Sequence, residues 1–108
     1  MKMRSTKIID DSFNLVMDAC KNGNIAVLSY ISEGNNILNQ IETGGESPLI
    51  VACRSGHFGI VKFILQHELY VIDPVILAKA ASVAKEQGND RVRSLLTLYY
   101  IKYCRYSA

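Results

Sequence analysis

Residues 47–65 read SPLIVACRSGHFGIVKFIL, and this stretch decides the fold. Ser47 and Pro48 form a helix start, because a serine hydroxyl caps free backbone N–H groups and proline is tolerated at the first helical position. Gly56 ends the helix that begins at Pro48, since glycine readily adopts the left-handed conformation of a helix C-terminus. The apolar residues beyond it fall in two pairs one turn apart, Ile60-Val61 and Ile64-Leu65. The stretch predicts two short helices joined by a tight turn.

The same pattern occurs 33 residues earlier in the chain. A shift by 33 pairs residues of similar type: Ala19-Cys20 with Ala52-Cys53, Gly23 with Gly56, Val27 with Ile60, Leu28 with Val61, and Ile31 with Ile64. Ser12 and Asn24 are the capping residues expected to start the two helices of this first unit. A fixed period of this length is typical of repeat proteins, in which each unit packs only against its neighbours.

A third and longer unit follows. Asp73-Pro74 repeats the start signal, but the next glycine is Gly88, which leaves room for a helix of 14 residues. Asn89 is expected to cap a last helix, whose inward stripe is Val92, Leu95, Leu96 and Tyr99. This unit is interpreted as the end of the stack.

With these residues the chain resembles the ankyrin repeat family over roughly residues 12–100, and residues 47–65 follow the family pattern almost position by position. The resemblance implies an all-α fold, a solenoid of stacked helix-turn-helix units with a short hairpin loop. It predicts an N-terminal extension at 1–11 and one domain at 12–108, with units of about 12–41, 42–73 and 74–108. Ile50 replaces the histidine of the family pattern, and Glu68 stands where a glycine usually closes the second helix. The junction between the second and third units is therefore expected to be irregular.

The resemblance also implies a function, that of a noncatalytic module that binds a protein partner through loop tips and the concave helix face. Family contacts come from the loop tip and from the two residues before the turn glycine. The matching positions are Lys21, Asn22, Thr43, Gly44, Glu46, Arg54, Ser55, Glu86 and Gln87. A small inhibitor or adaptor of an enzyme would use the same contacts, and the sequence does not separate it from a scaffold.

Two signals of other chemistry are weak. Cys53 and His57 have the spacing of a metal or nucleophile pair, but Gly56 interrupts the helix between them and Cys20 occupies the same repeat position as Cys53. Both cysteines are therefore interpreted as core residues. Gly44-Gly45 lacks the surroundings of a phosphate-binding loop. We expect no catalytic residue, no metal, no cofactor and no small-molecule substrate.

Composition agrees with a folded domain. Of 108 residues 49% are hydrophobic and 20% are charged, which is too apolar for a disordered segment. The net charge of +2 is too small to indicate a class of partner. Three widely spaced cysteines are unlike a disulfide scaffold, and the sequence carries neither a signal peptide nor an apolar run of membrane-spanning length. A cytoplasmic, reducing location is expected.

The C-terminal segment is the one with biased composition. From residue 91 to 108 it has no acidic residue, and basic side chains alternate with tyrosines. Such a segment can bind nucleic acid or an anionic membrane, although tyrosines at helical spacing more often pack a core or an interface. Apolar residues also extend around the last helix beyond its inward stripe. A contact edge is predicted there, for a partner, a second copy or a continuation of the chain, at Leu98, Tyr100, Ile101, Lys102 and Arg105.

Overall fold

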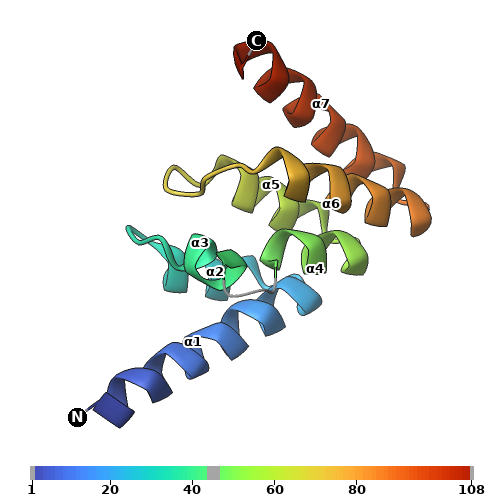
Figure 1. The fold of residues 1–108 in the computed structure, drawn as a ribbon. Coiled ribbons are helices and arrows are strands. Elements are labelled where there is room, and N and C mark those ends of the chain that lie inside the picture. Colours follow the sequence, from blue (N-terminus) through green and yellow to red (C-terminus); the bar gives the residue numbers. More distant parts are fainter. Residues whose placement is uncertain (1, 44–46, 108) are drawn as a thin grey trace.

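The computed structural model describes residues 2–43 and 47–107, with side chains described for 12–42 and 47–103. All regular structure in these ranges is α-helical (Figure 1). The helices are α1 (Lys2–Asn22), α2 (Ile25–Ser32), α3 (Ile37–Thr43), α4 (Pro48–Ser55), α5 (Phe58–Gln66), α6 (Pro74–Glu86) and α7 (Asp90–Ser107).

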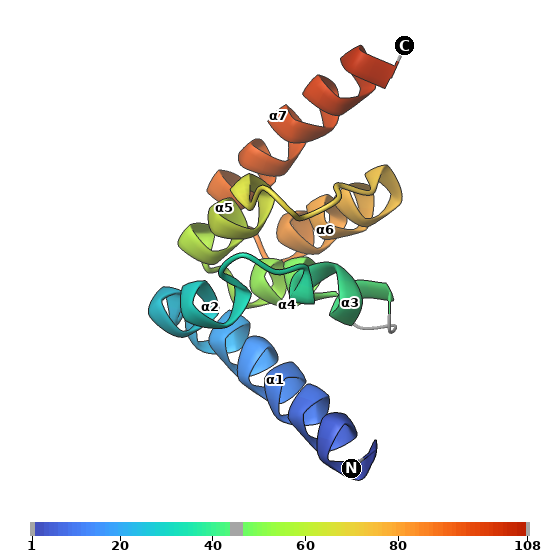
Figure 2. The same cartoon turned by 90° about the vertical axis from the view of Figure 1, so that its left-hand side faces the viewer.

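The helices form three stacked pairs. Helices α1, α4 and α6 run in the same direction and lie on one another in that order, while α2, α5 and α7 return beside them (Figure 1). Each inner helix packs against the next, α1 on α4 and α4 on α6. Helices α1 and α7 extend past the body at opposite ends (Figure 2). The result is an elongated molecule of 45 × 30 × 22 Å.

The turn inside each pair has the same geometry three times. Gly23, Gly56 and Gly88 all adopt positive φ, at 75°, 76° and 70°. After each glycine, a backbone N–H donates to the carbonyl of an alanine five residues earlier, the pairs being Asn24 to Ala19, His57 to Ala52, and Asn89 to Ala84. The alanines are buried, which lets the inner helices approach closely. The repeat seen in the sequence is therefore a repeat of backbone conformation.

The predicted capping residues are confirmed at the start of four helices. The Ser47 hydroxyl accepts from Ile50 N–H at 3.2 Å, and the Asp73 carboxylate accepts from Val75 N–H at 2.9 Å. Asn24 and Asn89 cap α2 and α7 in the same way. Helix α5 begins at Phe58, directly after His57, whose side chain does not cap the helix.

The core is continuous through the stack. Its largest fully buried side chains come from every unit, among them Leu28, Leu49, Ile60, Leu77 and Leu96. Burial of one such side chain stabilises a fold by about 1.5–3 kcal/mol. The apolar pairs predicted for the second helix, Ile60-Val61 and Ile64-Leu65, are all buried.

Two expectations about the elements were wrong. Helix α1 begins at Lys2 and passes through Ser12, because residues 2–22 contain no glycine or proline to stop a helix that packing stabilises at its other end. The link after α2 is also partly helical, since α3 extends to Thr43, which the sequence analysis placed at a loop tip. The predicted hairpin at residues 44–46 lies outside the described part of the chain. The boundary between an extension at 1–11 and a domain at 12–108 stays a prediction.

The junctions between units differ, as expected. The first contains α3, whose Leu38 and Ile41 reach the core one turn apart. The second, residues 67–73, contains no helix. Its backbone is held by α3 instead: the Asn39 side-chain amide donates to the Leu69 carbonyl, and its oxygen accepts from Val71 N–H at 2.9 Å.

Candidate protein-binding surface

The C-terminal ends of the inner helices carry six of the predicted contact residues. Lys21 and Asn22 end α1, Arg54 and Ser55 end α4, and Glu86 with Gln87 ends α6; all six are exposed. Because α1, α4 and α6 run in the same direction, these ends lie along one side of the stack (Figure 1). The structure thus brings together polar side chains from three separate units.

Hydrogen bonds between units hold this row of helix ends. The Nε2–H of His57 donates to the backbone carbonyl of Lys21 at 2.8 Å. One unit further, the Nδ2 of Asn89 donates to the carbonyl of Gly56 at 3.3 Å. Both donors are the residue after a turn glycine, so the same repeat position ties each turn to the unit before it. The positions of Lys21 and Arg54 are therefore set by backbone contacts that leave their side chains exposed.

The loop-tip residues form a separate group. Thr43 ends α3, and its side chain, together with Gly44 and Glu46, lies outside the described part of the chain. This group precedes the first turn of α4, whereas Arg54 lies on its last turn. Eight helical residues with a rise of about 1.5 Å each separate the two ends of α4 by roughly 10 Å.

A buried polar cluster anchors the described end of α3. One carboxylate oxygen of Glu42, Oε1, accepts from the Ser47 hydroxyl at 2.9 Å and from the Tyr70 hydroxyl at 2.7 Å. Burial raises the pKa of Glu42 above its ordinary value, and the two hydrogen bonds oppose that shift. The cluster joins α3, the start of α4 and the second junction, and sequence reasoning missed it because Tyr70 lies 28 residues from Glu42.

The cysteines behave as core residues. Cys20 and Cys53 are completely buried, and burial raises the pKa of each thiol to about 12. A thiol that stays protonated at neutral pH is a poor nucleophile and a poor metal ligand. Among the residues whose side chains are described, no group of three or more His, Cys, Asp or Glu could hold a metal ion.

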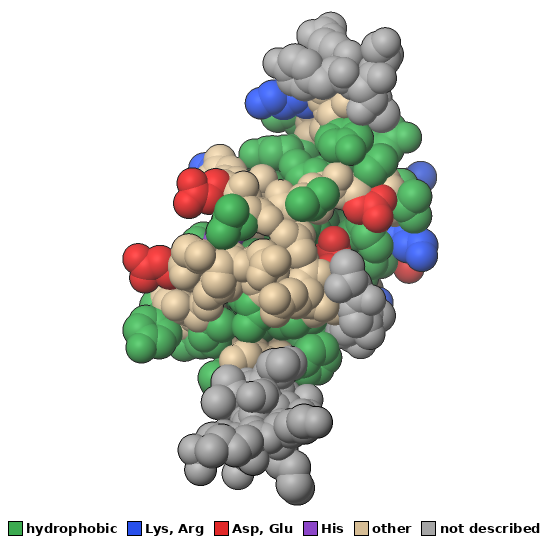
Figure 3. Space-filling model, turned by 60° about the vertical axis from the view of Figure 1, so that its left-hand side comes forward, with side chains coloured by type: hydrophobic (Ala, Val, Ile, Leu, Met, Phe, Trp, Pro, Cys, Tyr) green, Lys and Arg blue, Asp and Glu red, His purple; other side chains and the backbone are tan. Residues whose placement is uncertain are grey.

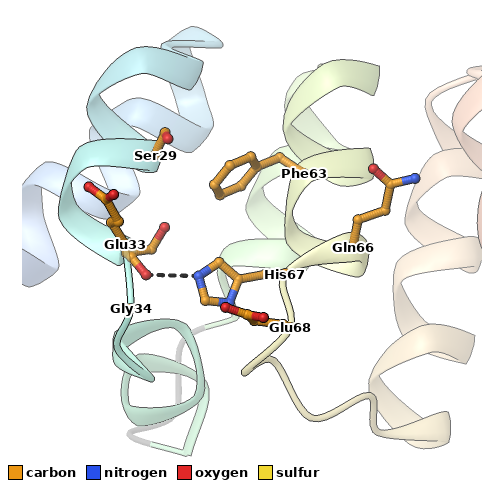
Figure 4. A pocket seen from close by; sticks show the side chains of 8 residues that line it. Ser29, Glu33, Gly34, Phe63, Gln66, His67 and Glu68 are labelled. Atoms are coloured by element: carbon orange, nitrogen blue, oxygen red, sulfur yellow. Dashed lines mark hydrogen bonds between the residues drawn. The ribbon is translucent and has the colours of Figure 1, made fainter.

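An open hollow that the sequence did not indicate lies between the ends of α2 and α5 (Figure 4). Its volume is about 400 Å³, and its wall includes Ser29, Phe63 and His67. His67 Nε2–H donates to the Ser32 carbonyl at 2.8 Å, and its Nδ1 accepts from Leu69 N–H at 3.2 Å. His67 therefore serves as a second tie between units, on the side of the outer helices.

The predicted edge on α7 is exposed. Leu98 and Ile101 are 62% and 56% accessible, Tyr100 and Lys102 are also exposed, and the side chain of Arg105 lies outside the described residues. Two of the basic groups nearby have intramolecular partners: Arg91 stacks on the Phe58 ring at 4.0 Å, and Arg93 lies 3.9 Å from Asp90. Figure 3 shows hydrophobic side chains on the surface just before the C-terminal end, and acidic ones over the middle of the molecule. No helix in the described ranges has the length and hydrophobicity to cross a membrane.

Stacked helical pairs, identical glycine turns and ties from each unit to the one before define a repeat solenoid. The family model described as ankyrin repeats (3 copies) matches residues 3–77, which is more than half of the chain. The chain belongs to the ankyrin repeat family, whose members generally mediate protein-protein interactions. No curated protein and no solved structure matches it. Beyond residue 77, the third unit still keeps the buried alanine, the turn glycine and the capping asparagine, at Ala84, Gly88 and Asn89.

Proposed function

We propose that this domain is a noncatalytic module that binds a protein partner through the C-terminal ends of its inner helices and the loop before α4. The observation that carries the proposal is the exposure of Lys21, Arg54 and Glu86 on three consecutive inner helices whose turns are tied together by hydrogen bonds. A backbone that is held in place loses little conformational entropy on binding, which favours recognition. An inhibitor or an adaptor of an enzyme would use the same surface, and these roles differ only in what the bound partner does.

The mixed charge of this surface indicates the form of the contact. Lys21 and Arg54 are basic, Glu86 is acidic, and the remaining side chains are neutral and polar. Polar groups of this kind usually form the rim of an interface and set its orientation, while apolar anchors supply most of the affinity. Ile50 is a half-buried apolar side chain one turn before Arg54 on α4.

A charge-reversal series tests the proposal. A protein partner is first selected from a displayed library against the wild-type chain, and its affinity is then measured for Arg54→Glu and for Lys21→Glu with Arg54→Glu. Lys62→Glu is the matched control, because Lys62 is an exposed cation on the outer helix α5 of the same unit. We expect the inner-helix variants to bind at least about tenfold more weakly and the control to bind normally. Equal affinity of all variants would place the partner on another surface.

A nucleic-acid or anionic-membrane binder is the alternative from another class. It would use the basic, tyrosine-rich segment of α7, and its affinity would fall steeply with salt. Arg91 is held against the Phe58 ring of α5, which limits its reach to a ligand bound along α7. A salt titration with RNA, DNA and anionic vesicles separates the two functions, since a protein contact with apolar anchors loses far less affinity.

A further inference from the structure

The outer face of the last helical pair differs from the same face of the units before it. Counted from the turn glycine, the fifth and ninth residues are Leu28 and Ser32 in the first unit and Val61 and Leu65 in the second, and all four are buried. The same positions in the third unit are Arg93 and Thr97, and both are exposed. The outer helix of each of the first two units contacts the outer helix of the next, α2 with α5 and α5 with α7. Within the described residues, nothing covers these positions in the third unit.

A further stacked unit of the same kind does not fit this face. It would bury Arg93 where the other units bury Leu28 and Val61, and a buried cation without a partner is strongly unfavourable. The one acidic group near Arg93 is Asp90, which is itself 88% exposed and 3.9 Å away. Whatever covers this face must therefore bring a carboxylate to Arg93.

The face also has an apolar groove. Two hollows of about 250 and 290 Å³ border Thr97, one between α6 and α7 and the other beside Leu98 and Ile101. The α6 wall of the first contains Ala78 and Ala81, whose small side chains allow another backbone to come close. Leu98 and Ile101 are exposed one turn apart on α7, and the exposed Tyr100 lines the hollow between α6 and α7. A groove between two antiparallel helices is the shape that accepts the apolar face of a third helix.

The net charge of the third unit indicates the charge of the helix that would bind in this groove. Residues 74–108 contain six basic residues, Lys79, Lys85, Arg91, Arg93, Lys102 and Arg105, and two acidic ones, Glu86 and Asp90, for a net +4. Since the whole chain carries +2, residues 1–73 carry −2. A second copy would offer residues 1–73 with a net charge of only −2, whereas a more acidic partner is attracted more strongly to this end of the stack.

We propose that the outer face of α6 and α7 binds an amphipathic helix of another protein, with apolar residues that enter the groove and Asp or Glu residues beside them that pair with Arg93. This surface is separate from the inner-helix ends of the proposed function. It gives the domain two faces, so that one chain can hold two proteins at once.

The test uses the full chain and a displayed library of helical peptides of about 18 residues, roughly five turns, with leucines on one face and random Glu, Lys, Gln or Ser elsewhere. We expect selection to enrich Glu over Lys beside the leucines by about tenfold or more. The enriched peptides should lose binding to Leu98→Ser with Ile101→Ser. The peptides should still bind the variant Lys21→Glu plus Arg54→Glu. They should also bind Tyr30→Ser, a matched control that removes an apolar side chain 83% accessible on α2. Arg93→Glu should shift the selection towards Lys.

Other outcomes overturn the proposal. No enrichment, enrichment of Lys, or binding that Leu98→Ser with Ile101→Ser leaves intact would each do so. A wild-type chain that sediments as a dimer, and becomes monomeric with the same double substitution, would assign the face to a second copy. Tighter binding of single-stranded RNA or phosphatidylserine vesicles than of the selected peptides, lost in the same double variant, would assign it to a polyanion.

Discussion

His57 and Lys21, 36 residues apart, are joined by a hydrogen bond of 2.8 Å from the imidazole Nε2–H to the backbone carbonyl. The ring lies against the first glycine turn, and a Cβ added at Gly23 would come within 2.8 Å of its Nδ1. Gly23 is thus required for two reasons, its positive φ and the space that the ring of the next unit occupies. The tie between the first two units depends on the absence of a side chain at this position.

Gly23→Ala should therefore destabilise the domain more than an alanine at another left-handed glycine. Gly34→Ala is the control, because Gly34 has φ +67° and no atom within 4 Å of an added Cβ. The control should cost about 1 kcal/mol for backbone strain alone, and Gly23→Ala should cost at least about 1 kcal/mol more, since the His57 ring must move. Urea unfolding followed by circular dichroism measures the difference. Equal losses would show that the ring adapts without cost.

Ala52→Asp should unfold the domain. Ala52 is completely buried between stacked inner helices, and an unpaired carboxylate at such a position costs about 3 kcal/mol or more, a large part of the stability of a small domain. Ala78→Asp, on the exposed side of α6, should leave the thermal midpoint within a few degrees of wild type. A cooperative, wild-type melting curve for Ala52→Asp would contradict the position of this alanine in the core.

Glu42→Gln should change how stability depends on pH. Because burial raises the pKa of this carboxyl in the folded state, the folded chain holds the proton more tightly than the unfolded chain does. Stability from this group is therefore highest at low pH and falls as pH rises from the ordinary value of 4.5 through the higher pKa of the folded state. Glutamine cannot ionise, and its Oε1 can still accept from Ser47 and Tyr70.

We accordingly expect Glu42→Gln to be at least as stable as wild type at pH 7, and the difference to vanish in acid. Denaturant midpoints measured from pH 4 to pH 8 provide the comparison, with Glu33→Gln as an exposed control that leaves the profile unchanged. If Glu42→Gln instead loses stability relative to wild type as the pH rises from 4 to 7, the charged hydrogen bonds of Glu42 outweigh the cost of its burial.

Cys20 and Cys53 should resist alkylation in the native protein. Each thiol is fully buried and has a pKa near 12, so at pH 8 little thiolate forms and reagent has no access. Iodoacetamide labelling followed by peptide mass spectrometry should modify both residues only after unfolding. Rapid native labelling of Cys53 would instead support a reactive cysteine beside His57.

Much of the architecture was predictable because its signals are local. A capping side chain acts on backbone groups two or three residues away, and a turn glycine acts at its own position, so Ser47, Asp73, Asn89 and the three turn glycines could be assigned without knowledge of their neighbours in space. The same holds for the apolar pairs of α5, whose spacing sets which side is buried. These features determined the period, the direction of the helices and the class of fold.

The start of α1 and the existence of α3 were not predicted correctly. No residue that stops a helix precedes Ser12, so α1 extends to Lys2. Ser12 therefore lies inside the helix and does not start it. Helix α3 does have a local signal, since Asn35 accepts from Ile37 N–H at 3.0 Å and Leu38 and Ile41 fall one turn apart. Its short length of seven residues hid this signal beside the polar link that follows.

The sequence by itself determined which residues start, turn and bury each unit, because those choices depend on atoms within about one helical turn. Only the tertiary structure decided which units touch through which side chains. His57 meets Lys21, His67 meets Ser32, and Tyr70 meets Glu42 because stacking places positions some 30 residues apart at hydrogen-bonding distance. The tertiary structure also decided that Arg93 is exposed where Leu28 and Val61 are buried. Burial at that position depends on whether another unit lies above it, and no local pattern in the chain carries that information.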